Sequence, residues 1–112
     1  MIDCTILRAG DGLHYAQDGE RVVVHYKMSL AKTGKLVHSS FEKMKPFIFQ
    51  VGVGQVIPGW DAAVKQLSKG GCAQFVIPAA MGYGSKGVPG LIPPNADLSC
   101  EVEVMSILAV SD

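Results

Sequence analysis

The chain has no excess charge of either sign and no long apolar run. Ten Lys and Arg residues balance ten Asp and Glu residues, so no net field would recruit nucleic acid or an anionic membrane surface. No apolar stretch approaches the ~20 residues that a membrane-spanning helix needs. The opening residues also lack the basic segment and apolar run of a signal peptide. We therefore expect a cytoplasmic protein that binds neither nucleic acid nor membrane.

Cysteine is scarce and unpaired in its spacing. Cys4, Cys72 and Cys100 are odd in number and far apart, which favours three reduced thiols over a disulfide framework. The same spacing does not fit a zinc site, and the three histidines form no HExxH-type pair. No serine has the G-x-S-x-G setting of a nucleophile. We expect neither a metal nor a cofactor.

Alternating apolar and polar residues dominate what is present. A chain of 112 residues is expected to form one domain, residues 1–112. Apolar residues occur at every second position within 21–30, 72–77 and 98–105, which predicts strands with one buried face. Shorter strands are expected over residues 2–7 and 46–50. Strands with one apolar face are typical of an antiparallel sheet.

A single helix is expected, starting at Pro58, where a missing N–H costs nothing. Trp60, Val64 and Leu67 then lie along one stripe at three- and four-residue steps. Gly70 follows as a left-handed stop. One short helix beside antiparallel strands predicts the α+β class, with the helix covering one face of a curved sheet.

Residues 82–96 form a loop rich in Gly and Pro that also carries apolar side chains. A loop this long is uncommon in a small domain unless it has a function. Its G-x-G-x-x-G spacing at Gly82–Gly87 matches a dinucleotide motif, but Pro89 and Pro93 prevent the helix that such a motif requires. Apolar loop residues must pack somewhere, and a concave site walled by the loop is the interpretation that we favour.

A set of large apolar residues falls near the helix start and this loop. Core packing is the ordinary role of such residues. However, Trp60 opens the helix and Tyr83 lies in the loop, and side chains in such positions often line a cleft. The set predicts an apolar bowl with a few N–H and hydroxyl donors, suited to a small apolar ligand or a proline-containing peptide. Its members are Tyr26, Phe47, Val56, Ile57, Trp60 and Tyr83.

Several short motifs occur together in one order over residues 2–107. They are Val24-His-Tyr26, Gly34-Lys35, Ser39-Ser40, Lys45-Pro-Phe47, Val56-Ile-Pro-Gly-Trp60, Gly82-Tyr-Gly84 and Pro89-Gly-Leu-Ile-Pro-Pro94. In this order and spacing the chain resembles the FKBP-type peptidyl-prolyl cis-trans isomerases. The resemblance implies a twisted antiparallel half-barrel wrapped around one short helix, isomerisation of apolar-X–Pro bonds in peptides or proteins, and binding of macrolides such as tacrolimus and rapamycin in the same pocket.

The resemblance also implies roles for individual residues. The catalytic group comprises Tyr26, Ile57, Trp60 and Tyr83, with Trp60 as the pocket floor. In the family, the backbone N–H at the Ile57 position and the hydroxyl at the Tyr83 position bind carbonyls of the proline-like group. The expected substrate-binding residues are Val37, His38, Phe47, Val56, Val88, Leu91, Ile92 and Cys100.

Some of these positions depart from the family pattern. Val37-His38 stands where Phe-Asp is common, and Cys100 stands where the last strand has an aromatic residue. The departures predict weaker activity and macrolide affinity, and they leave open an alternative, an FKBP-fold interaction module with vestigial activity. Val88-Pro89 is itself an apolar-Pro dipeptide. We therefore expect mostly monomer, with weak self-association in which one molecule inserts this loop into a neighbour.

Overall fold

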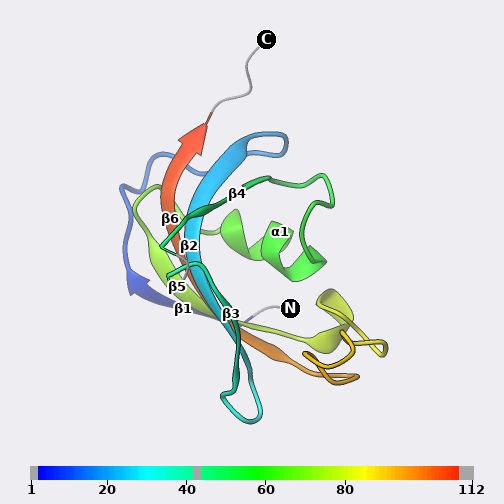
Figure 1. The fold of residues 1–112 in the computed structure, drawn as a ribbon. Coiled ribbons are helices and arrows are strands. Elements are labelled where there is room, and N and C mark those ends of the chain that lie inside the picture. Colours follow the sequence, from blue (N-terminus) through cyan, green and yellow to red (C-terminus); the bar gives the residue numbers. More distant parts are fainter. Residues whose placement is uncertain (1–2, 42–43, 109–112) are drawn as a thin grey trace.

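The computed structural model describes residues 3–41 and 44–108. Within them, six strands form one antiparallel sheet that curves around a single α-helix (Figure 1). The helix, α1, covers Pro58–Val64, and a 3₁₀ turn, η1, covers Ala79–Met81. The strands are β1 (Asp3–Arg8), β2 (Arg21–Leu30), β3 (Leu36–Ser39), β4 (Phe47–Gln50), β5 (Cys72–Ile77) and β6 (Leu98–Leu108). The α+β class predicted from the sequence is confirmed.

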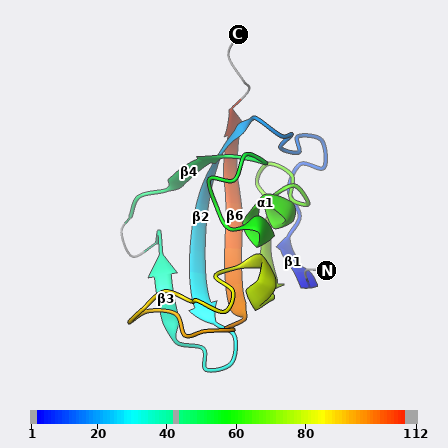
Figure 2. The same ribbon diagram turned by 90° about the vertical axis from the view of Figure 1, so that its right-hand side faces the viewer.

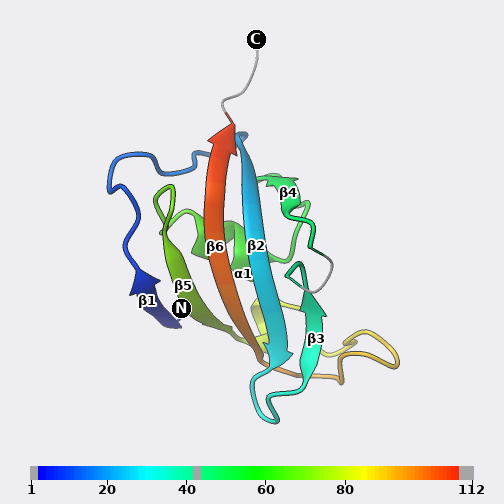
Figure 3. The same cartoon turned by 60° about the vertical axis from the view of Figure 1, so that its left-hand side comes forward.

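The order of the strands is β1-β5-β6-β2-β3, and the short β4 also pairs with β2. Strand β4 pairs with the first part of β2, at Arg21–Val24, whereas β3 pairs with the last part, at Lys27–Ser29. Both strands therefore share the edge of β2 that β6 does not occupy, as Figure 3 shows. The sheet is open, and its long central pair, β2 and β6, forms its spine.

Period-two alternation sets the core on the concave face of the sheet. Side chains at alternate positions of β2, β5 and β6 are buried, while their neighbours face outward. The ladder between β2 and β6 shifts register between Val23 and Val24, and such an irregularity bends and twists a strand. The fully buried residues on the inner face include Val22, Val24, Ala73, Phe75, Ile77, Leu98, Cys100 and Val104.

Helix α1 lies inside the curve of the sheet, with Trp60, Ala63 and Val64 buried. It ends at Val64, earlier than the stripe of apolar residues predicts. Leu67 is buried but belongs to a following turn, in which its amide bonds to the carbonyl of Val64 at 3.1 Å. Tertiary packing of Leu67 thus accounts for the apolar position without another turn of helix. Neither helical segment of the described chain is long and apolar enough to cross a membrane.

The loop over residues 82–96 is tightly hydrogen-bonded rather than irregular. The amides of Val88 and Ile92 each bond to the other residue's carbonyl at 2.8 Å, and the Asn95 amide closes back on the Gly84 carbonyl at 2.9 Å. In Figure 2 this loop lies on the same side of the sheet as α1 and reaches across β2 toward β3. The loop therefore completes a wall that the helix begins.

Candidate functional site

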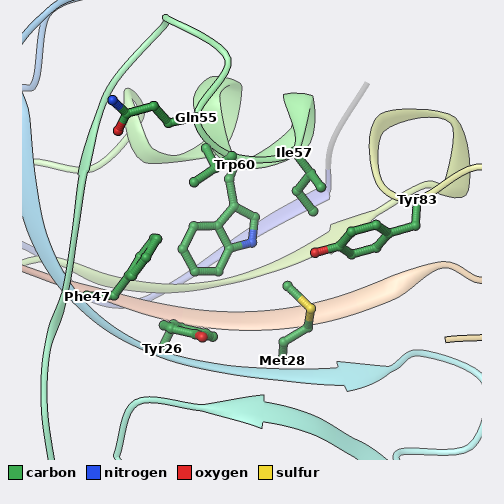
Figure 4. Close-up of a pocket in the computed structure, with 8 residues that line it drawn as sticks. Tyr26, Met28, Phe47, Gln55, Ile57, Trp60 and Tyr83 are labelled. Carbon is green, nitrogen blue, oxygen red and sulfur yellow. The ribbon is translucent and has the colours of Figure 1, made fainter. Parts of the chain in front are cut away.

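The floor of the site is the indole of Trp60, which is 4% exposed. Pro58 is the first residue of α1, so Trp60 lies in the first turn of the helix. The indole ring projects from the helix toward the sheet (Figure 4). Tyr26 meets the indole edge-on, with ring centroids 4.8 Å apart, and Phe47 does so at 6.1 Å. Edge-to-face contacts of this kind are favourable beyond the area they bury. These contacts hold the indole in one orientation in the structure, which contains no ligand.

Above this floor lies a cavity of about 410 Å³, which is within the range of small-ligand sites. Strands β2 and β4, the segment before α1 and the 82–96 loop each contribute to its wall. Figure 4 shows the hydroxyl of Tyr83 directed into the cavity from the loop side, opposite Phe47. The lining residues are Tyr26, Met28, Phe47, Gln55, Val56, Ile57, Trp60 and Tyr83.

Two donors at this cavity are available to a ligand. Within the described residues, the amide of Ile57 donates to no other group, although its carbonyl accepts the amides of Trp60 and Asp61. The hydroxyl of Tyr83 likewise has no partner among them, and the residue is 39% exposed. Gln55 differs, because its side-chain oxygen accepts the amide of Gln50 at 2.8 Å. The site thus offers an apolar surface with two free donors at its edge.

A second cavity, of about 290 Å³, adjoins the first. Tyr26, Met28 and Tyr83 line both, so these three side chains form the ridge between them. The rest of the wall of the second cavity comes from β3 and the 82–96 loop. It consists of Val37, His38, Val88, Leu91 and Ile92. Except for His38, that wall is aliphatic.

Tyr26 is held in place at both ends. Its amide donates to the hydroxyl of Ser40 at 2.7 Å, and its carbonyl accepts the amide of Ser40 at 3.0 Å. Its phenol oxygen lies 3.0 Å from Nδ1 of His38. Burial raises the pKa of the Tyr26 phenol, and the neighbouring Tyr83 and Cys100 act in the same direction. Tyr26 therefore remains a neutral, oriented phenol at physiological pH.

The structure brings eleven of the twelve residues singled out in the sequence to these two cavities. Cys100 is the exception and corrects the expectation that it lines the pocket wall. Its side chain is fully buried, lines neither cavity, and lies under Trp60, whose Nε1–H points to its Sγ at 3.5 Å. The absence of an aromatic ring at this position therefore changes the support of the floor rather than the wall.

Two lining residues, Met28 and Gln55, were not among the predicted site residues. Met28 shares the inward face of β2 with Tyr26, two residues away, and this spacing was a usable signal. The sequence contains no comparable signal for Gln55, because the position of this residue depends on the turn that carries the chain from β4 to α1. All three cysteines are free thiols, as the sequence predicted.

Comparison with known proteins agrees with this geometry. The family profile described as FKBP-type peptidyl-prolyl cis-trans isomerase matches residues 13–105. The chain is 45% identical over 102 residues to FK506-binding protein 1 of Debaryomyces hansenii, covering 91% of this chain and 90% of that protein. It is 44% identical over 98 residues to the peptidyl-prolyl cis-trans isomerase Fkbp12 of Drosophila melanogaster, covering 88% of this chain and 90% of the relative.

A third relative extends the match along the chain. The peptidyl-prolyl cis-trans isomerase of Schizosaccharomyces pombe is 39% identical over 106 residues, or 95% of this chain and 94% of that protein. The open, curved sheet around one short helix, the aromatic cavity and these matches define one class. The chain belongs to the FKBP family and is an FKBP-type peptidyl-prolyl cis-trans isomerase.

Proposed function

We propose that the cavity over Trp60 holds the proline ring of a peptide and that the enzyme acts on apolar-X–Pro bonds. The observation that carries this proposal is the pairing of an aromatic floor with two unpartnered donors, the Ile57 amide and the Tyr83 hydroxyl. A proline ring is apolar and has no N–H, while the carbonyls on either side of it need donors. The cavity meets both needs.

Catalysis in such a site requires no nucleophile. Rotation about an X–Pro bond must cross a barrier of about 20 kcal/mol, because resonance keeps the amide planar. A twisted amide has less charge separation than a planar one, so a site that excludes water favours it. Trp60, Tyr26 and Phe47 supply that environment. Only interactions that are stronger in the twisted state accelerate the step, and the Ile57 amide and Tyr83 hydroxyl would hold the carbonyls while the bond turns.

The second cavity suits the residue next to the proline. Consecutive Cα atoms are about 3.8 Å apart, so a side chain adjacent to a proline on Trp60 would cross the ridge made by Tyr26, Met28 and Tyr83. Beyond that ridge, Val37 and Leu91 offer aliphatic surface. An apolar X residue is therefore the favoured occupant.

The same two cavities would accept a macrolide of the tacrolimus or rapamycin type. The names of some relatives record FK506 binding, and in this chain an apolar ring would fill the first cavity while the rest of the ligand covers the second. Because Val37 is small, the second cavity leaves part of such a ligand without aromatic contact. We expect the affinity to be lower than in family members with an aromatic residue there.

We further infer a cytoplasmic protein of one domain that is mostly monomeric. Self-association through Val88-Pro89 would be weak, because the Val88 side chain lines its own molecule's cavity and its amide is bonded to Ile92. Of the two residues of this dipeptide, only Pro89 is exposed. Concentration-dependent NMR shifts at Gly87–Gly90 and Trp60 would reveal insertion, and invariant spectra up to about millimolar protein, where weak complexes form, would exclude it.

The proposal is tested by isomerase turnover on a Leu-Pro peptide, with and without tacrolimus. Turnover above the uncatalysed rate that is lost on titration with the macrolide supports one shared site. Background turnover with intact folding would instead favour the alternative of an interaction module. Turnover that tacrolimus does not inhibit would separate the macrolide site from the catalytic one.

A further inference from the structure

Strand β4 has a free edge beside the site. Among the strands that the structure describes, β4 pairs with β2 alone. Successive backbone N–H groups of a strand point to opposite edges. The Val51 amide donates toward β2, to the Glu20 carbonyl at 2.9 Å, and the Gln50 amide donates the other way, to the Gln55 side chain at 2.8 Å. By this alternation the N–H and C=O of Ile48 also point away from β2.

The backbone N–H and C=O of Ile48 form an open pair on this edge. Neither group has a hydrogen-bond partner within the described residues. On one side of the pair Gln55 occupies the Gln50 amide, and on the other side Pro46 has no N–H to offer. Proline and short strands are ways in which proteins keep a free edge from recruiting other chains at random. The open pair can therefore bind one short stretch of extended chain.

Exposed apolar side chains surround the open pair on the outer face of the sheet. Ile48 is 53% exposed and pairs with Val23 of β2. His25 is the next outward-facing residue of β2, and Phe41 stacks on its ring with centroids 4.9 Å apart. Met44, which is 89% exposed, closes a turn with Phe41 through a bond from its amide to the Phe41 carbonyl at 3.1 Å. Clustered exposed apolar groups of this kind are typical of interaction surfaces.

We propose that the free edge of β4 binds the extended segment that follows the proline in a polypeptide substrate, and that this segment joins the sheet at Ile48. The inference rests on the proposed placement of the proline over Trp60. Strand addition gives affinity through main-chain hydrogen bonds and specificity through side chains on alternate sides. An unfolded protein with apolar residues after the proline is the partner that these features fit.

The edge is continuous with the cavity over Trp60. Phe47, the neighbour of Ile48, lines that cavity on the wall opposite Tyr83 (Figure 4). Since the residue before the proline is assigned to the second cavity, on the Tyr83 side, the chain after the proline leaves past Phe47. The rings of Phe47 and Trp60 are 6.1 Å apart, and each residue advances an extended chain by about 3.5 Å. The second or third residue after the proline would therefore meet the open pair.

The test compares a short and a long peptide by exchange NMR, which needs no coupled protease. The short peptide ends one residue after Leu-Pro, and the long peptide continues with alternating Val and Ser. The edge would bind the planar and twisted amides equally, which lowers KM and leaves kcat unchanged. We expect KM to be about threefold to tenfold lower for the long peptide, as for one or two hydrogen bonds. N-methylation of its second or third residue after the proline should remove this gain.

Hydrogen exchange of the Ile48 amide gives a second, structural measurement. Without a partner this amide should exchange fast in the free protein. Saturation with the long peptide should slow its exchange, whereas saturation with the short peptide should not.

Variants locate the effect. Ile48→Pro deletes the open N–H but none of the bonds from β4 to β2, since proline is accepted where an edge N–H faces solvent, and it should remove most of the KM gain. Ile48→Thr and Phe41→Ser keep every backbone group and should each remove part of it. Val76→Thr is the matched control, because Val76 is an exposed residue on β5, which β6 separates from β2.

The outcomes separate the two proposals. Equal KM values for the two peptides, with normal turnover of both, overturn binding at the edge and leave the proposed function intact. Absence of turnover on both peptides overturns the proposed function instead. A KM gain that survives Ile48→Pro, or that Val76→Thr removes equally, also overturns the inference. Slow Ile48 exchange that depends on protein concentration without peptide would assign the edge to a second copy of the chain and overturn it as well.

Discussion

The indole Nε1–H of Trp60 points to the Sγ of Cys100 across 3.5 Å, so the floor of the site rests on a buried thiol. Cys100 is fully buried near the start of β6, and its side chain lies between the indole and the backbone of the sheet. Burial raises the pKa of this thiol to about 11, and the hydrogen bond from Trp60 lowers it only in part. The position thus belongs to the core that supports the site, even though only one side chain separates it from the ligand.

Cys100 should resist thiol reagents while Cys4 and Cys72 react. Thiolate is the reactive form, and a pKa of about 11 together with complete burial leaves almost none of it accessible at pH ~8. Cys4 and Cys72 are only partly buried. Alkylation with iodoacetamide followed by peptide mass spectrometry measures how fast each of the three thiols is modified. Urea-unfolded protein is the control in which all three react. Modification of Cys100 in the folded protein as fast as Cys72 would refute this placement.

Cys100→Phe and Val37→Phe should act in opposite ways, although each adds one aromatic ring. At Cys100 the ring has no space and overpacks the core, lowering the free energy of unfolding by about 1–3 kcal/mol. At Val37 it enters the open second cavity and adds contact for a ligand, which should raise macrolide affinity by about threefold to tenfold. Urea titration and calorimetry of tacrolimus binding measure the two effects. A stabilised Cys100→Phe protein would show that the cavity reaches β6.

Tyr83→Phe should weaken ligand binding without loss of stability. The Tyr83 hydroxyl has no partner within the described residues, so its removal leaves nothing unpaired. One lost hydrogen bond to the ligand corresponds to about 0.5–1.5 kcal/mol, or roughly threefold to tenfold in Kd. Tyr26→Phe is the matched control, because it also deletes a phenol at the site but breaks the contact with His38. Fluorescence of Trp60, the only tryptophan, follows binding in both variants.

Trp60→Ala tests whether the floor is also structural. Trp60 is 4% exposed and contacts three aromatic rings, so truncation should lower the free energy of unfolding by about 3–5 kcal/mol. Trp60→Phe keeps most of this packing and should retain the fold while reducing macrolide affinity. Circular dichroism during thermal unfolding measures stability, and calorimetry measures affinity. Unchanged affinity in the folded Trp60→Phe and Trp60→Ala proteins would place the site elsewhere.

The sequence predicted those parts of the fold that local patterns encode. Alternation located β2, β5 and most of β6, and the pair Pro58–Trp60 located the helix start. Strand β3 carried no alternation signal, and only its ladder with β2 makes it a strand. The motifs also predicted the residues around the cavities, but not that β6 would turn Cys100 behind Trp60. Whether an inward-facing residue meets a ligand or a neighbouring ring depends on the curvature of the sheet, which no local pattern contains.

Acid should weaken the turn at residues 11–14 through Asp11. Its carboxylate accepts the amides of His14 and Leu13 and pairs with the His14 ring, and these contacts, led by the His14 amide, lower the Asp11 pKa to about 2. A depressed pKa contributes stability that is present above the ordinary value of 3.8 and is lost as pH falls toward about 2. Asp11→Asn should therefore reduce the acid dependence of Tm in this window. Identical Tm–pH curves for both proteins would contradict the assignment.

Gly87→Ala should disrupt the site from within the 82–96 loop, whereas Gly84→Ala should be nearly tolerated. Both glycines have positive φ, 60° and 61°, so each substitution incurs a similar backbone penalty of about 1 kcal/mol. A Cβ at Gly87 would also collide with the backbone of Ile92 and Pro93, while one at Gly84 meets nothing within 4 Å. The collision would push apart the segment that carries Val88 and Ile92, both of which line the second cavity. We expect Gly87→Ala to lower Tm and kcat/KM on a Leu-Pro peptide well below the Gly84→Ala values. Equal behaviour of the two variants would mean that the loop accommodates the Cβ and does not shape the site.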